Sequence, residues 1–263
     1  MFSNETMTLS IRNGLLTLAF SVLIVLALAY GFLTFILVTR EGWSAVVGQG
    51  SLLRLLLETA ATPAGGLIGF ALIRQAYRKS TAPELFFFSF FIVALAGESL
   101  LLAQAWVNFE GLASYFTALV TRIVWAFRFA GLFLLLSASL YSFEFSYRKY
   151  GNLVAASVGA GIFLAVLLPL HSSSARNHLL FAVGDTPGMV LVTILLALVV
   201  AGNFLLGSQR PGASESAWVR AWAAVSFLTA WSVAIIAGPW GTLLAIPGVI
   251  LACLNAEQNS LMG

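Results

Sequence analysis

Apolar runs of about 20 residues, separated by short polar links, constrain this chain more than any other feature. An α-helix needs about that length to cross the hydrocarbon core of a bilayer. Apolar residues make up 60% of the sequence and charged residues 9%, whereas a soluble domain carries about 25% charged residues. We therefore expect an all-α fold, a polytopic transmembrane helical bundle in which residues 1–263 form a single integral membrane domain.

The apolar runs predict eight spans. The first run is about 25 residues long, which exceeds the 7–15-residue core of a signal peptide, so we expect a retained helix. The last run is short and contains Pro247, so seven spans with a short or re-entrant last segment are the alternative. The predicted spans lie near residues 14–38, 50–73, 85–107, 112–142, 151–170, 188–207, 217–237 and 241–255.

The basic residues predict the orientation. Cytoplasmic loops carry an excess of Lys and Arg, and here eight such residues fall on one side of the predicted spans and two on the other. We expect both termini to be cytoplasmic, in a plasma membrane or a bacterial inner membrane. The eight are Arg12, Arg74, Arg78, Lys79, Arg148, Lys149, Arg210 and Arg220, and the two are Arg40 and Arg176.

Five charged residues lie within the predicted spans: Arg54, Glu58, Glu98, Arg122 and Arg128. An unpaired charge at bilayer depth costs about 2.5–3.5 kcal/mol on insertion scales, so each needs a partner, water or a ligand. With a rise of 1.5 Å per residue, four of them fall about 6–14 Å below the outer boundary and Arg128 about 23 Å below it. We expect a charged slab in the outer half of the membrane, with Arg128 beneath it.

Helix geometry restricts how these charges pair. Arg54 and Glu58 are four residues apart on one helix face and can meet directly. Arg122 and Arg128 differ by about 120° around their helix, so they cannot both point at one spot. One of them is expected to pair with Glu98, and the other to face a cavity or the charges of the second helix. The five charges sum to +1, and a surplus guanidinium favours an anion because it binds carboxylate or phosphate oxygens bidentately.

Neutral side chains near the same level complete the predicted site. Trp106 and Trp125 can supply apolar or cation–π walls, and Gln104 and Asn108 add hydrogen-bonding capacity. The predicted ligand-binding residues are Arg122, Arg128, Glu98, Arg54, Glu58, Gln104, Trp106 and Trp125. We expect neither a cofactor nor a metal ion.

Two further patterns have a functional and a structural interpretation. His171, His178 and Asp185 could form a loose metal site or an acid/base pair, but their spacing matches no metal motif, so an exposed loop is the preferred interpretation. Small residues, such as Gly65, Gly69 and those of segment 151–161, predict close helix approach. That approach occurs within the chain or between the copies of a homo-oligomer.

Three classes of function fit these observations. The first is a transporter, channel or receptor-like protein that binds a small anionic ligand in an outer-half cavity. The second is a membrane sensor or an accessory subunit of a larger membrane complex, in which the Arg and Glu residues are structural. The third is an intramembrane enzyme acting on lipid head groups, but no nucleophile–base–orienter set is visible, so we lean away from an enzyme. Because no basic patch with interleaved aromatic residues occurs, we expect no nucleic-acid partner.

Overall fold

The computed structural model describes residues 3–42, 50–79, 83–109, 114–141, 150–176, 180–183, 186–209 and 228. These residues are almost entirely helical, as predicted. The helices are α1 (Ser3–Glu41), α3 (Gly50–Lys79), α4 (Pro83–Ala96), α5 (Leu101–Phe109), α6 (Ser114–Tyr141), α7 (Tyr150–Leu167) and α8 (Thr186–Ser208), and a short 3-10 helix, η1 (Gly97–Leu100), joins α4 to α5. The predicted spans 217–237 and 241–255 lie outside the described residues, apart from Leu228.

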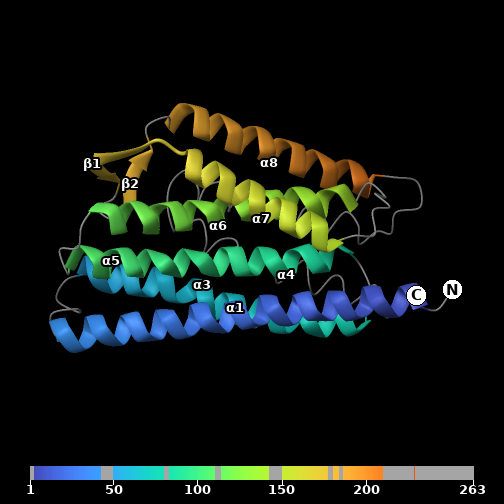
Figure 1. Ribbon diagram of the computed structural model, residues 1–263, viewed down its shortest axis with the longest axis horizontal. Helices are drawn as coiled ribbons and strands as arrows, with labels where there is room; N and C mark the ends of the chain where they lie inside the picture. The colour runs from blue at the N-terminus through green and yellow to red at the C-terminus, as the bar shows by residue number, and fades with distance from the viewer. Residues whose placement is uncertain are drawn as a thin grey trace.

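The helices run back and forth along one axis (Figure 1). Among the described residues, five helical stretches are long and apolar enough to cross a membrane, one of them made of α4, η1 and α5 together, which indicates a membrane protein. They correspond to the predicted first, third, fourth, fifth and sixth spans, and lie at residues 13–40, 85–107, 114–141, 150–167 and 187–208. The second predicted span falls within α3, which is 30 residues long and contains Pro63.

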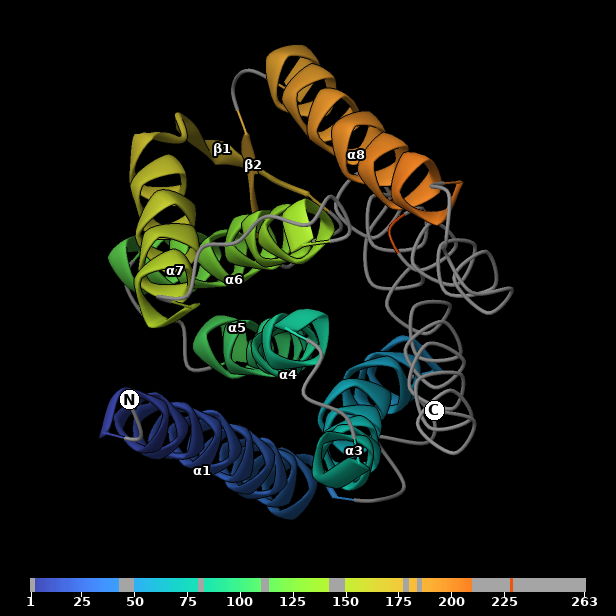
Figure 2. The same ribbon diagram turned by 90° about the vertical axis from the view of Figure 1, so that its right-hand side faces the viewer.

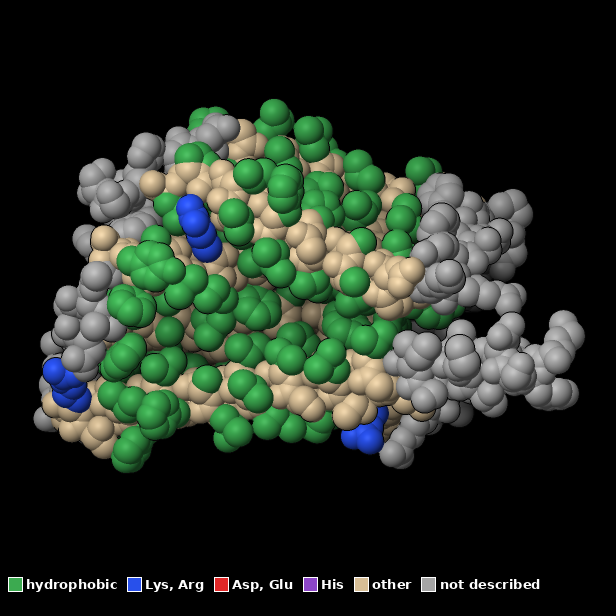
Figure 3. All heavy atoms as spheres, viewed as in Figure 1, with side chains coloured by type: hydrophobic (Ala, Val, Ile, Leu, Met, Phe, Trp, Pro, Cys, Tyr) green, Lys and Arg blue, Asp and Glu red, His purple; other side chains and the backbone are tan. Residues whose placement is uncertain are grey.

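The bundle is built around the helices that carry the predicted charges. Viewed end-on, α6 and the joined α4 and α5 lie in the middle, with α1 and α3 on one side and α7 and α8 on the other (Figure 2). Within the most apolar part of each span, 83% of residues are buried for 85–107 and 67% for α6, against about a fifth for α1, α7 and α8. The outer helices therefore expose apolar side chains (Figure 3), as lipid contact requires.

Two features of the described chain differ from the predictions. The predicted loop after α7 contains an antiparallel hairpin of β1 (Leu170–Arg176) and β2 (Leu180–Val183), which contacts α6. The hairpin pairs backbone groups that a solvated loop would leave to water. The third predicted span is also not one continuous α-helix, because η1 interrupts it with a 3-10 hydrogen bond from the Leu101 N–H to the Glu98 carbonyl.

Proline does not interrupt α3. Pro63 has no N–H to donate to the carbonyl of Thr59, four residues earlier. The Thr62 hydroxyl donates to that carbonyl instead, at 2.9 Å. The Thr59 carbonyl thus keeps a hydrogen-bond donor, and α3 continues as a helix on both sides of the proline.

A glycine sets the closest helix contact. A Cβ atom at Gly161 of α7 would lie 2.5 Å from the backbone nitrogen of Ala130 and 2.9 Å from the carbonyl oxygen of Ala126, both in α6. The lack of a side chain at this position lets the two backbones meet. The predicted close packing of segment 151–161 is thus found within the chain at Gly161, whereas Gly159 faces open space.

Candidate functional site

A buried ion pair links the two central helices. Arg128 of α6 donates from Nε to Glu98 Oε1 at 2.6 Å and from Nη2 to Glu98 Oε2 at 2.8 Å. The side chains are only 5% and 1% exposed, respectively. Paired, parallel hydrogen bonds of this kind are the strongest arrangement available to a guanidinium and a carboxylate. The pair therefore neutralises both charges where an unpaired one would be costly.

The direction of side chains on a helix explains why these residues meet. Side chains lean toward the N-terminus of their own helix, and the span bearing Glu98 is antiparallel to α6 (Figure 1). Glu98 and Arg128 thus lean toward each other along the bundle axis. The predicted depth of Arg128 counts backbone rise alone, and the lean of the two side chains brings its guanidinium to the Glu98 carboxylate.

A glycine next to the pair allows α6 to approach η1. A Cβ atom at Gly97 would lie 2.3 Å from Cγ of Phe127. The aromatic ring occupies the space that any other residue would fill at this position. Gly97 therefore helps to place Glu98 against α6.

Trp125 covers the pair from the same helix. The Cζ atom of Arg128 lies 4.9 Å from the centre of a Trp125 ring, a cation–π distance. The predicted cation–π wall is thus found at Trp125. Its side chain is 2% exposed, and its Nε1 has no hydrogen-bond partner among the described residues.

Neutral polar groups continue from the pair along α5 and α6. Gln104 Nε2 donates to Thr117 Oγ1 at 3.1 Å, and Thr121 Oγ1 donates to the Thr117 carbonyl at 2.7 Å. All three side chains are buried. The structure thus uses Gln104 to link two helices, in addition to any role toward a ligand.

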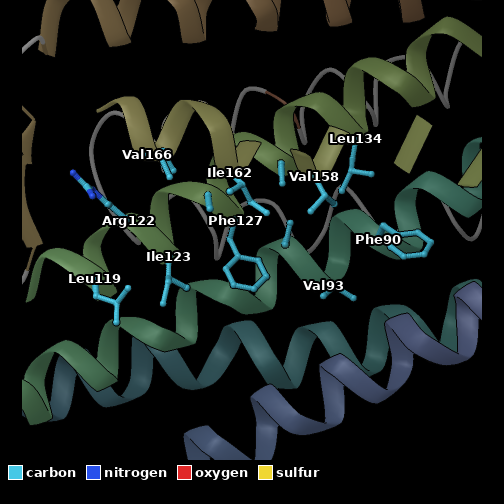
Figure 4. Close-up of a pocket in the computed structure, with 14 residues that line it drawn as sticks. Phe90, Val93, Leu119, Arg122, Ile123, Phe127, Leu134, Val158, Ile162 and Val166 are labelled. Carbon is cyan, nitrogen blue, oxygen red and sulfur yellow. The ribbon is translucent and has the colours of Figure 1, made fainter. Parts of the chain in front are cut away.

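Arg122 has a different environment from Arg128. It is exposed, and no ion pair involves it within the described part of the chain. Its side chain lies at one end of a groove of about 520 Å³ between α4, α6 and α7 (Figure 4). The predicted pairing of one arginine with Glu98 is thus found for Arg128, whereas Arg122 lies at the edge of the groove with its guanidinium directed away from the other labelled lining residues (Figure 4).

The groove is otherwise apolar. Its lining residues are Phe90, Val93, Ala94, Leu119, Ile123, Ala126, Phe127, Ala130, Leu134, Val158, Ile162, Ala165 and Val166, together with Arg122. Several of them, on α6 and α7, are also exposed to the surroundings of the bundle. The groove therefore opens sideways, toward the region where a bilayer would contact the helices.

The remaining predicted residues are placed only in part. The backbones of Arg54 and Glu58 lie in α3, but their side chains fall outside what the structure describes, as does that of Asn108. Trp106 is half-buried on α5. His171 lies in β1, whereas His178 and Asp185 are outside the described residues. Whether Arg54 pairs with Glu58 stays a prediction.

The sequence offered little sign of the polar contacts that join α6 to the later helices. Ser137 and Ser157 share a hydrogen bond at 3.0 Å between α6 and α7. Asn203 of α8 donates to Ser139 at 3.1 Å. Serine is common in helix interfaces within membranes, but a single serine in an apolar run does not identify its partner. The contribution of α7 to the groove had no sequence signal, because its lining residues are ordinary apolar ones.

Comparisons of the chain with protein-family models, with curated proteins and with solved structures found no match.

Proposed function

We propose that the protein is an integral membrane protein that binds an anionic ligand at Arg122, in the outer half of the membrane, as a transporter, channel or receptor-like protein. One observation carries the proposal: Glu98 neutralises Arg128, while Arg122 is exposed at the end of a groove. Of the two arginines of α6, only Arg122 is thus available to an external anion. Arg54 and Glu58 balance each other in formal charge, so Arg122 is also the surplus charge of the five.

The proposed topology has eight spans with both termini on the cytoplasmic side. It is supported by the distribution of Lys and Arg in the links. Cysteine labelling of intact cells, in a Cys253→Ser background, tests it. A membrane-impermeant maleimide should react with Ser173→Cys, in the hairpin, and should not react with Ala82→Cys, between α3 and α4. Reversed labelling would contradict the orientation.

The binding proposal is tested with the full chain in vesicles of a zwitterionic lipid, using radiolabelled inorganic phosphate as the probe. Arg122→Gln removes the charge and should weaken phosphate binding about tenfold or more, because a charge-assisted hydrogen bond is lost. Arg74→Gln is the matched control, since Arg74 is also exposed but lies in α3, away from the groove. Equal binding by the two variants would refute the assignment to Arg122.

A second function is favoured by the closed geometry of the ion pair. Glu98 and Arg128 satisfy each other within the bundle, as expected if the charges fix helix register in a sensor or an accessory subunit of a larger membrane complex. In that case a membrane subunit should copurify in fixed proportion with the tagged chain, and Arg122→Gln should leave phosphate binding unchanged.

A further inference from the structure

The groove next to Arg122 has the dimensions of a single hydrocarbon chain. Arg122 and Leu134 both line it and are twelve residues apart on α6, which corresponds to about 18 Å at 1.5 Å per residue. One leaflet of the hydrocarbon core is about 15 Å thick, half of the full core. The length of the groove is thus similar to the depth of one leaflet.

Its width accommodates a polymethylene chain. A volume of about 520 Å³ over a length of about 18 Å gives a mean cross-section of at least about 29 Å². A polymethylene chain is about one carbon contact distance wide and fits within this cross-section.

The charge lies at the end of the groove that is nearer to the outer membrane boundary. Arg122 and Val166 lie toward one end of the groove, and Phe90 and Leu134 toward the other (Figure 4). Arg122 is eight residues from the start of α6, at the end of the bundle that carries the hairpin (Figure 1). Long basic side chains near the ends of membrane helices extend to the interface, and on α6 the lean of side chains carries Arg122 in that direction.

We infer that the ligand of this site is an anionic membrane lipid, which enters sideways from the bilayer. One acyl chain lies along the groove between α4, α6 and α7, and Arg122 binds the phosphate of the head group. The inference rests on the proposed anion binding at Arg122 and specifies its ligand class. Charge complementarity at Arg122 selects an anionic over a zwitterionic lipid, and burial of the acyl chain holds the lipid in the groove.

Native mass spectrometry of the full chain, purified in a neutral detergent, tests the inference. Phosphatidylglycerol and phosphatidylcholine with identical acyl chains are the two probes, because they differ in head-group charge. We expect the wild-type chain to bind phosphatidylglycerol about tenfold more tightly. Arg122→Gln should remove this preference, whereas Arg74→Gln should retain it.

A groove-filling substitution tests the acyl chain separately. Val158 lines the groove on α7 and is 37% exposed, so Val158→Trp should fill it and weaken the binding of both lipids. Val192→Trp is the matched control, because Val192 is 44% exposed on α8 and does not line the groove. Lipid binding that is unchanged by Val158→Trp would overturn the inference. So would conversion of a dimer to a monomer by Val158→Trp alone, since the occupant would then be a second copy.

The two proposals fail in different ways. If inorganic phosphate binding depends on Arg122 but phosphatidylglycerol gains nothing from its acyl chains, the lipid inference is wrong and the proposed anion site stands. If neither phosphate nor phosphatidylglycerol binding depends on Arg122, both are wrong.

Discussion

Replacing either Glu98 or Arg128 alone should destabilise the bundle far more than replacing both residues together. The perturbation is a double-mutant cycle with Glu98→Leu, Arg128→Met and the combination of the two. Each single substitution leaves one charge without its partner in a site where the side chains are at most 5% exposed. Removing one member of a buried pair costs about 3–5 kcal/mol, whereas replacing both with apolar residues of similar size is often neutral or stabilising.

The coupling energy can be worked out from the geometry. Two unit charges about 4 Å apart interact by about 4 kcal/mol at an effective dielectric constant of 20. The distances of 2.6 and 2.8 Å between donors and acceptors place the charged groups in this range. We therefore expect the double variant to lose about 4 kcal/mol or more less free energy of unfolding than the two single variants lose together. Arg128→Met also removes the cation–π contact with Trp125. If this contact outweighs the difference in side-chain packing, Arg128→Met should lower the free energy of unfolding more than Glu98→Leu does.

The assay is equilibrium unfolding of the purified full chain in mixed micelles, followed by circular dichroism. Ser137→Ala and Ser157→Ala provide the control cycle, because these residues share a neutral hydrogen bond between α6 and α7. Such bonds contribute about 0.6 kcal/mol on average within membranes. If the Glu98 and Arg128 effects add to within about 0.5 kcal/mol, the two residues act independently. That result would refute the reasoning.

Two further predictions concern the helices around the site. Gly161→Ala should destabilise the chain by about 1–3 kcal/mol, because the added Cβ would meet the backbone of α6. Gly159→Ala is the control and should be neutral or stabilising, because that position has open space. An equal loss of stability for both variants in the same unfolding assay would contradict close packing at Gly161. Thr62→Val should cost about 1 kcal/mol, because the Thr59 carbonyl next to Pro63 loses its hydroxyl donor. Thr34→Val is its control, since the buried Thr34 hydroxyl has no partner among the described residues; a larger loss for Thr34→Val would argue against the role of Thr62.

The sequence was informative about the fold because hydrocarbon imposes a simple rule on span length. The start and end of α6 and α8 lie within two residues of the prediction. The apolar pattern also placed Glu98 and Arg128 on neighbouring spans. It did not predict η1. Gly97, the first residue of η1, packs against Phe127, thirty positions further along the chain, and an apolar pattern does not reveal such a contact.

The candidate site was predictable in its charges but not in its shape. The sequence predicts that Arg122 and Arg128 point in different directions and that one of them pairs with Glu98. The structure shows that the paired residue is Arg128. The depth predicted for Arg128 counts backbone rise alone, which says nothing of where a side chain ends. The groove was not predictable, since Val158 and Ile162 differ in no visible way from other lipid-facing residues until α7 is packed on α6.

The short η1 segment also changes how the third span presents its surface. Side chains advance by about 120° per residue in a 3-10 helix and about 100° in an α-helix. Over the four residues of η1, the difference accumulates to about 80°. The face of α5 that contacts other helices is therefore rotated relative to the contacting face of α4. A single helical wheel drawn over 85–107 would assign the residues of α4 or of α5 to the wrong face. A substitution that returned Gly97–Leu100 to α-helical geometry would rotate Gln104 relative to Phe91 and so disturb both ends of the span.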